Sequence, residues 1–194
     1  MTSELFDREG HRKYLTAEER AAFLRAADKA DRTVKTFCYL LHFTGCRISE
    51  ACELTFDRVD LAGEVIVFET KKKRRRGVYR AVPVPPALLN VLDLVHGVRE
   101  RQQSKTRGKG ERLWEWSLTT AWRRVKEVME AAGLGEGPQV SPKGLRHGFG
   151  VHAINSGVPL NKLSQWLGHA QLSTTAIYAD AVGAEEKNIA SRMW

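Results

Sequence analysis

Residue types that can act on a phosphate ester gather near the C-terminal end of the sequence. The segment 141–180 carries Arg146, then the pair Gly168-His169, and then Tyr178. An arginine guanidinium is planar and permanently charged, and it fits the oxygens of a phosphate. A tyrosine hydroxyl can attack phosphorus and hold it covalently. The types and the order of these residues indicate chemistry on a phosphate.

A second arginine with suitable surroundings lies much earlier, in the segment TGCRISEACEL. Gly45 permits a turn after an apolar helix, and Arg47 then begins a short helix. The N-terminus of a helix favours an anion, so this position suits a negatively charged group. A salt bridge from Arg47 to Glu50 is the structural alternative.

The charge of the chain favours a polyanionic partner. Lysine and arginine number 31 against 23 aspartate and glutamate residues, which gives a net charge of +8 and a pI near 9.6. Nucleic acid is the simplest such partner, although charge alone also fits a merely basic protein. The candidates for contacts with a nucleic-acid backbone lie in a basic run, a basic loop and one helix face: Lys72, Lys73, Arg74, Arg75, Lys105, Arg107, Lys109, Arg123 and Arg124.

Other features of the sequence exclude several classes of protein. The cysteines are odd in number and lie in apolar, helical sequence, so we expect reduced core thiols rather than disulfides. No apolar run has the length of a signal-peptide core or of a membrane span, which predicts a soluble, cytoplasmic protein. We predict no metal site, because no metal-ligand spacing relates His42, His96 and His152. No other cofactor is expected.

The periodicity predicts a mainly α chain with a small three-stranded antiparallel sheet, an α+β fold. Thr16 and Glu19 form a capping-box pattern ahead of an apolar helical repeat, which places the first helix. After the short helix that Arg47 begins, the period changes to that of strands at 58–61, 65–68 and 78–84. Further helices are expected at 87–101, 119–132, 143–155, 160–167 and 173–178. We predict an extended arm over 1–14, one domain over 15–182 and an amphipathic tail helix over 183–194.

Four segments in this order resemble the catalytic domain of the tyrosine recombinases, the phage integrase family. They are TGCRISEACEL, the strand-turn-strand that contains residues 71–76, SPKGLRH, and LGH followed by Tyr178. The resemblance extends from about residue 15 to residue 181, and it depends on the agreement of several motifs in order and spacing. It implies the fold of that catalytic domain.

The resemblance also implies a reaction and a role for each motif residue. In this family a tyrosine attacks a DNA phosphodiester, forms a 3′-phosphotyrosine and frees a 5′-hydroxyl, without metal or nucleotide. Tyr178 is then the nucleophile, Arg47 and Arg146 clamp the scissile phosphate, and His169 donates a hydrogen bond to it. Lys71 is the expected general acid for the leaving 5′-oxygen, with Lys72 and Lys73 as alternatives.

The chain departs from the family pattern at two places. Lys143 stands where histidine is usual, three residues before Arg146; it could still bind the phosphate or help to deprotonate Tyr178. His147 is expected to pack or to orient its neighbours rather than to react. In addition, only about fifteen residues precede the expected catalytic domain, where family members usually carry a DNA-clamping helical domain.

The sequence leaves alternatives for the function. The first hypothesis is an enzyme that exchanges strands of double-stranded DNA as a homotetramer, since both strands of two duplexes must be cut. The alternative is a noncatalytic or accessory DNA-binding module of the same fold, which the lysine at position 143 favours. A nicking and closing enzyme of the type IB topoisomerase kind fits the short chain poorly. The tail at 183–194 is expected either to dock into a neighbouring subunit or to fold back.

Overall fold

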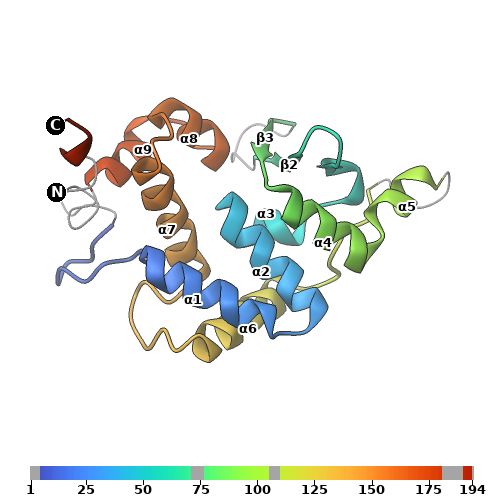
Figure 1. Ribbon diagram of the computed structural model, residues 1–194, viewed down its shortest axis with the longest axis horizontal. Helices are drawn as coiled ribbons and strands as arrows, with labels where there is room; N and C mark the ends of the chain where they lie inside the picture. The colour runs from blue at the N-terminus through green and yellow to red at the C-terminus, as the bar shows by residue number, and fades with distance from the viewer. Residues whose placement is uncertain (1–4, 71–76, 105–109, 181–189, 194) are drawn as a thin grey trace.

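The computed structural model describes residues 5–70, 77–104, 110–180 and 190–193 (Figure 1). Helices dominate, with one small antiparallel sheet, as the sequence predicts. The α-helices are α1 (Ala17–Asp28), α2 (Arg32–Thr44), α3 (Ile48–Cys52), α4 (Pro86–His96), α5 (Val98–Gln103), α6 (Leu118–Ala131), α7 (Pro142–Asn155), α8 (Leu160–Leu167) and α9 (Ser173–Ala176). Short 3-10 turns are η1 (Phe56–Arg58), η2 (Ile177–Asp180) and η3 (Ser191–Met193).

The sheet has the order β1 (Val59–Asp60), β2 (Val65–Glu69) and β3 (Tyr79–Pro83), with both pairs antiparallel. Side chains alternate between a buried and a more exposed face along β2 and β3. Ile66 pairs with Val82, and both are fully buried. The inward face also carries a charged residue, Arg80, which lies opposite Phe68 in the register.

Local sequence signals account for the ends of the first helices. Thr16 and Glu19 form the predicted capping box at the start of α1. Helix α2 ends at Gly45, which has φ +60°, a conformation that favours glycine. A Cβ at Gly45 would lie 2.4 Å from the ring of Phe149 on α7. The glycine therefore permits both the turn before Arg47 and the close approach of α7 to α2.

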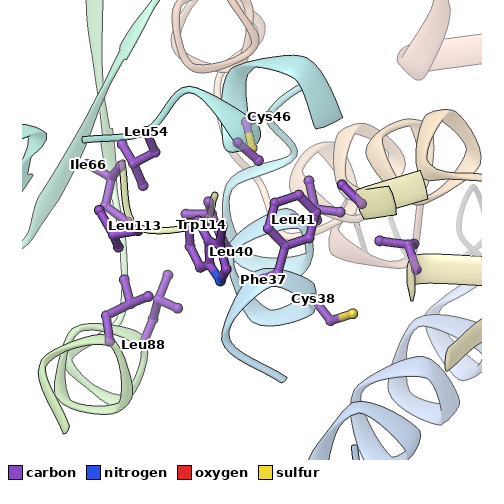
Figure 2. Packing of buried hydrophobic residues seen from close by; sticks show 14 of the residues in the cluster. Phe37, Cys38, Leu40, Leu41, Cys46, Leu54, Ile66, Leu88, Leu113 and Trp114 are labelled. Atoms are coloured by element: carbon purple, nitrogen blue, oxygen red, sulfur yellow. The ribbon is translucent and has the colours of Figure 1, made fainter. Parts of the chain in front are cut away.

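The main core lies between α2, the sheet and the helices around them (Figure 2). Phe37 of α2 packs edge-on against Trp114, with ring centroids 5.1 Å apart. The indole N–H of Trp114 donates to the carbonyl of Thr33 at 3.1 Å, so its one polar atom is satisfied inside the core. The cysteines are buried as free thiols, as predicted: Cys38, Cys46 and Cys52.

A second apolar cluster joins the two ends of the described chain. Leu5 and Tyr14 from the N-terminal segment lie with Phe149, Leu163 and Tyr178 from the C-terminal helices. The segment 5–14 doubles back on itself, because the N–H of residue 13 donates to the carbonyl of Leu5 at 2.7 Å. The prediction of an extended arm is therefore wrong over residues 5–14. Burial of the Leu5 side chain holds this segment against the domain.

Two other element predictions need correction or lie outside the described residues. The helix predicted over 87–101 is interrupted at Gly97, which takes φ +65° and separates α4 from α5. Tyr178 lies in η2 instead of continuing the α-helical turn of α9. Of the tail helix predicted over 183–194, the structure describes only residues 190–193. No helix among the described residues has both the length and the apolar character that crossing a bilayer requires.

Candidate active site

One cavity of about 410 Å³ brings together most of the catalytic candidates that the sequence singles out. Arg47 comes from the start of α3, Lys143 and Arg146 from α7, His169 from the loop after α8, and Tyr178 from η2. Lys71 lies outside the described residues. Four separate segments of the chain thus contribute to one concave surface, and its lining includes the cationic side chains of Arg47, Lys143 and Arg146.

Arg146 is the most firmly held residue of the site, with 7% of its surface exposed. Its Nη1 donates to the carbonyl of Gly45, and its Nη2 donates to the carbonyl of Leu167, each at 2.7 Å. Nη2 also lies 3.1 Å from Nε2 of His169. Burial, and then the charge of Arg47, lowers the pKa of Arg146 to about 10, which leaves it charged at neutral pH.

Arg47 has a looser environment, and 45% of its side chain is exposed. Its Nη1 lies 3.1 Å from Oε1 of Glu50, and its backbone N–H donates to Oε2 of the same carboxylate at 2.8 Å. The salt bridge that the sequence allowed as an alternative is therefore present. It holds Arg47 at the start of α3 without removing the side chain from the cavity wall.

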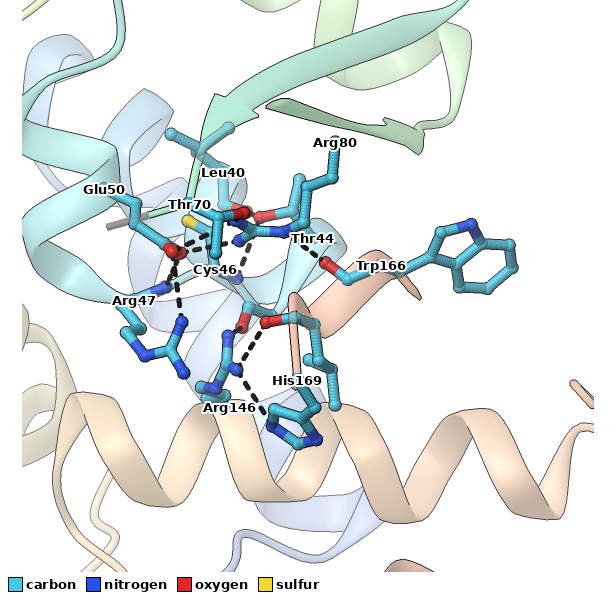
Figure 3. Close-up of polar contacts among 12 residues, drawn as sticks. Leu40, Thr44, Cys46, Arg47, Glu50, Thr70, Arg80, Arg146, Trp166 and His169 are labelled. Carbon is cyan, nitrogen blue, oxygen red and sulfur yellow. Dashed lines mark hydrogen bonds and ion pairs between the residues drawn. The ribbon is translucent and has the colours of Figure 1, made fainter. Parts of the chain in front are cut away.

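Glu50 is shared with a second arginine, Arg80 of β3, which the sequence analysis did not single out (Figure 3). Arg80 Nη1 and Nη2 donate to the two oxygens of Glu50, at 3.1 and 2.6 Å. Burial by itself raises the pKa of the Glu50 carboxyl, but the bonds from Arg80 and the charges of Arg80 and Arg47 hold it below its ordinary value. A carboxylate thus stays ionised inside the domain because two guanidinium groups bind it.

Arg80 also links the sheet to the loop that carries His169. Its Nε donates to the carbonyl of Trp166 at 2.7 Å, and its Nη1 lies 3.1 Å from the hydroxyl of Thr70 (Figure 3). Gly168 takes φ +67°, and a Cβ there would lie 3.1 Å from the Arg80 side chain. A signal in the sequence was available: Arg80 alternates with Val82 and Val84 on the inward face of a strand, and a buried arginine requires a buried partner.

His169 follows Gly168 directly, and both of its ring nitrogens have partners. Nδ1 lies 2.8 Å from the hydroxyl of Thr175, and Nε2 lies 3.1 Å from Arg146. Burial, followed by the charge of Arg146, lowers the pKa of His169 to about 4, so the imidazole is neutral at pH 7. Because guanidinium can only donate, Nε2 accepts from Arg146, and the remaining proton is on Nδ1.

Tyr178 forms part of the inner wall of the cavity, with 1% of its surface exposed. Its hydroxyl lies 3.1 Å from Nδ1 of His147. Its ring stacks on His169 with a centroid distance of 6.2 Å and an interplanar angle of 16°. Gly150 permits this position, because a Cβ there would lie 2.6 Å from the Tyr178 ring.

The remaining predicted residues are distributed more widely. Lys143 is exposed and lines the cavity. Arg123 and Arg124 are exposed on α6, at 3.8 and 3.1 Å from Glu127 of the same helix, and neither lines the cavity. Seven predicted contacts lie outside the described residues: Lys72, Lys73, Arg74, Arg75, Lys105, Arg107 and Lys109.

A group that could bind a metal ion occurs on the N-terminal segment and not at the cavity. Potential ligand atoms of Asp7, Glu9 and His11 lie within 4.8 Å of one another, and two of these residues are exposed. None of them lines the cavity. The charged side chains that do line it are arginine and lysine, which suit an anion.

Comparison with known sequences identifies related proteins. The model of the phage integrase family matches residues 13–184. Tyrosine recombinase XerA of Pyrococcus furiosus is 30% identical over 188 residues, which cover 93% of this chain and 61% of that protein. Tyrosine recombinase XerD of Mycobacterium tuberculosis is 35% identical over 146 residues, covering 72% of this chain and 45% of that protein. The chain therefore spans only part of the length of these relatives.

Comparison with solved structures finds the same fold. A crystal structure of XerA recombinase matches with a TM-score of 0.76 at 23% identity, over 93% of this chain and 64% of that one. The catalytic domain of bacteriophage HP1 integrase matches with a TM-score of 0.61 at 22% identity, over 91% and 93% of the two chains. XerH recombinase bound to its difH substrate before cleavage matches with a TM-score of 0.71 at 22% identity, over 97% of this chain and 59% of that one. The mainly helical fold with a three-stranded sheet is thus that of recombinase catalytic domains.

Proposed function

The chain belongs to the phage integrase family, and we propose that it contains the catalytic domain of a site-specific tyrosine recombinase that cuts and rejoins double-stranded DNA. The observation that carries this proposal is the convergence of Arg47, Arg146, His169 and Tyr178 on one cavity. These residues come from segments up to 131 positions apart, from 47 to 178, and they supply a nucleophile and donors for one phosphate.

In the proposed reaction the hydroxyl oxygen of Tyr178 attacks the scissile phosphorus and forms a 3′-phosphotyrosine. The 5′-oxygen leaves and takes a proton from a general acid, for which Lys71 is our candidate, with Lys72 and Lys73 as neighbours. A 5′-hydroxyl of another strand then attacks the phosphotyrosine and restores a phosphodiester. The covalent bond to Tyr178 conserves the energy of the broken linkage, so the scheme uses neither metal nor nucleotide.

We propose that the two arginines stabilise the negative charge that develops in the transition state. Negative charge grows on the equatorial oxygens as Tyr178 attacks, and fixed donors stabilise it more than they stabilise the ground state. The carbonyl bonds of Arg146 fix its guanidinium before DNA arrives. Arg47 is fixed through Glu50 and remains half exposed, which suits a residue that meets the phosphate from the open side.

His169 requires a change of protonation to fulfil its proposed role. Its Nε2 accepts a bond from Arg146 in the resting protein, so a hydrogen bond from Nε2 to phosphate needs an added proton. The negative charge of a bound phosphate raises the pKa of a nearby imidazole. We therefore assign to His169 the uptake of a proton as DNA binds.

The assembly on DNA is also part of the proposal. Strand exchange cuts both strands of two duplexes, so we propose a homotetramer of the whole protein on DNA. We assign Lys143 to the scissile phosphate. The residues assigned to the DNA backbone are Lys72, Lys73, Arg74, Arg75, Lys105, Arg107, Lys109, Arg123 and Arg124. We propose a catalytic domain over 15–182; the family model matches residues 13–184.

Covalent capture from a DNA pool tests the proposal and does not require a defined target site. The probe is a pool of duplexes with a randomised core and a nick on one strand. After cleavage, the short fragment that carries the free 5′-hydroxyl diffuses away, so the covalent complex persists. We expect wild-type protein to retain DNA through a denaturing wash, and Tyr178→Phe to retain none. Tyr79→Phe, which alters an exposed tyrosine of β3, is the matched control and should behave as wild type.

The outcomes separate the two candidate functions. Covalent DNA that persists in Tyr178→Phe would refute the assignment of the nucleophile. Binding without any covalent complex in the wild type would favour the noncatalytic DNA-binding module. Arg47→Ala and Arg146→Ala should each lower the cleavage rate by about 10²–10³ while the protein still binds the captured duplex.

A further inference from the structure

The contact between Tyr178 and His147 has no part in the roles assigned so far. Nδ1 of His147 lies 3.1 Å from the Tyr178 hydroxyl, and the two residues are 5% and 1% exposed. His147 directly follows Arg146 on α7, and it lines the same cavity. The other ring nitrogen, Nε2, is buried and has no hydrogen-bond partner among the described residues.

We propose that His147 is the catalytic base that accepts the hydroxyl proton of Tyr178 while that oxygen attacks phosphorus. The inference rests on the recombinase function proposed above and names one further catalytic residue for it. It also replaces the expectation that His147 only packs or orients its neighbours.

The proposed step is balanced in atoms and charge. A lone pair of the tyrosine oxygen forms the bond to phosphorus, and the hydroxyl proton passes to Nδ1 of His147. The bond from phosphorus to the 5′-oxygen breaks, and its electron pair stays on that oxygen. The 5′-oxygen takes a proton from the general acid, so one proton is gained by the base and one is lost by the acid.

The other candidates for this proton are less well placed. Lys143 lies one turn before His147 on the same face of α7, but it is exposed, and an ammonium group has no lone pair to accept a proton. Both ring nitrogens of His169 already have hydrogen-bond partners, Thr175 and Arg146. His147 instead has Nδ1 within hydrogen-bond distance of the tyrosine oxygen, at 3.1 Å.

The surroundings of His147 keep it in the form that accepts a proton. Burial, and then the charges facing it, lowers the pKa of His147 to about 4, so the imidazole is neutral at pH 7. The facing groups, besides the phenol of Tyr178, are Lys143 and Arg146 of α7, His169 of the loop after α8, and Lys13 of the N-terminal segment. The lysine and arginine charges disfavour the imidazolium form of His147, and the negative charge of a bound phosphate opposes this effect.

The tautomer of His147 can be measured in the wild-type protein without DNA. We expect ¹⁵N chemical shifts of the imidazole to show an unprotonated Nδ1 and a protonated Nε2, because the phenol donates to Nδ1. A proton on Nδ1 would mean that His147 donates to the tyrosine oxygen, and this result would overturn the proposal. The experiment needs no substitution, so a folding defect cannot obscure it.

Single-turnover cleavage of a duplex captured from the pool tests the chemistry itself. At neutral pH we expect His147→Gln to cleave about 10²–10⁴ times more slowly than wild type, with unchanged affinity for the duplex. The rate deficit should narrow at alkaline pH, because hydroxide can then take the phenol proton in place of the base. His152→Gln, which changes an exposed histidine of the same helix, should cleave as wild type does.

The other outcomes refute the inference and leave the proposed function standing. A deficit of the same factor at every pH would indicate a merely structural role for His147. A faster reaction in His147→Gln would show that His147 restrains Tyr178, and an unchanged rate would show that another group accepts the proton. Failure of the proposed function itself is distinct, since the wild type would then form no covalent complex.

Discussion

Removal of the Arg80 side-chain charge should expose how strongly the site depends on one buried ion pair. In Arg80→Met the carboxylate of Glu50, with 2% of its side chain exposed, loses both of its bonds to Arg80. It keeps the bonds from Arg47, whose side chain is half exposed. Breaking a buried ion pair from one side costs about 3–5 kcal/mol, because a charge is left buried without its partner. At about 2–4 °C per kcal/mol for a chain of this size, the melting temperature should fall by about 6–20 °C.

The free energy of unfolding that Arg80→Met loses should depend on pH. In the wild type the pKa of Glu50 is below its ordinary value, so its contribution to stability is present at neutral pH and is lost as the pH falls through the folded-state pKa. In Arg80→Met, burial without the cation should raise the pKa of Glu50 above its ordinary value. The carboxyl then takes up a proton on mild acidification. The difference in the free energy of unfolding between wild type and variant should therefore be larger at about pH 8 than at about pH 5.

Urea denaturation of the wild type, Arg80→Met, Glu50→Gln and the double variant measures these quantities. The double variant has no buried charge at either position, so it should be more stable than Arg80→Met at neutral pH. A cost below about 1 kcal/mol, or a cost that stays constant between the two pH values, would refute the reasoning. If the losses in free energy of unfolding in the two single variants simply add up to the loss in the double variant, the reasoning is also refuted, because residues in direct contact must couple.

Two further results should follow from other contacts. Gly168→Ala should cost about 1 kcal/mol more free energy of unfolding than Gly133→Ala. The two glycines have nearly the same φ, +67° and +68°, but of the two only Gly168 has a position where an added Cβ would press on Arg80. Equal losses in the free energy of unfolding, measured by urea denaturation, would contradict the expectation. Stability should also fall as the pH is lowered from about 6.5 to about 4, because the unfolded chain protonates its histidines there. Burial and neighbouring cations keep His42 and His147 neutral in the fold, with pKa values of about 3 and about 4, so an unchanged free energy of unfolding over this range would contradict the assignment.

Most secondary structure was predictable because it depends on signals that are local in the sequence. The capping box of Thr16 and the change of period after the TGCRISE segment place α1 and the sheet correctly. The break at Gly97 was missed because apolar residues continue at helical spacing on both sides of it, and glycine is tolerated inside a helical pattern. The choice between a continuous and a broken helix depends there on packing and on the left-handed conformation of one residue.

The folded N-terminal segment was not predictable from its own residues. It is polar apart from a few side chains, and the side chains that bury Leu5 belong to the cluster around Phe149 and Leu163. Contacts over such sequence distances leave no periodic signal in the segment itself. An apolar residue at position 5 is therefore consistent with a free arm or a docked one until the partner surface is known.

Motifs in the sequence singled out charged and aromatic residues that line the cavity, whereas the contacts that hold those residues were not predicted. The sequence presented a phosphate clamp and a salt bridge to Glu50 as competing explanations of Arg47, since a carboxylate beside the clamp would repel a phosphate and neutralise the arginine. The structure removes this conflict, because Glu50 receives a full bidentate pair from Arg80 and only a single side-chain bond from Arg47. Arg80 bonds Glu50 without lining the cavity, and Arg47 keeps a half-exposed side chain in the cavity wall. Arg80, a strand residue outside every motif, thus shares the carboxylate of Glu50 with Arg47.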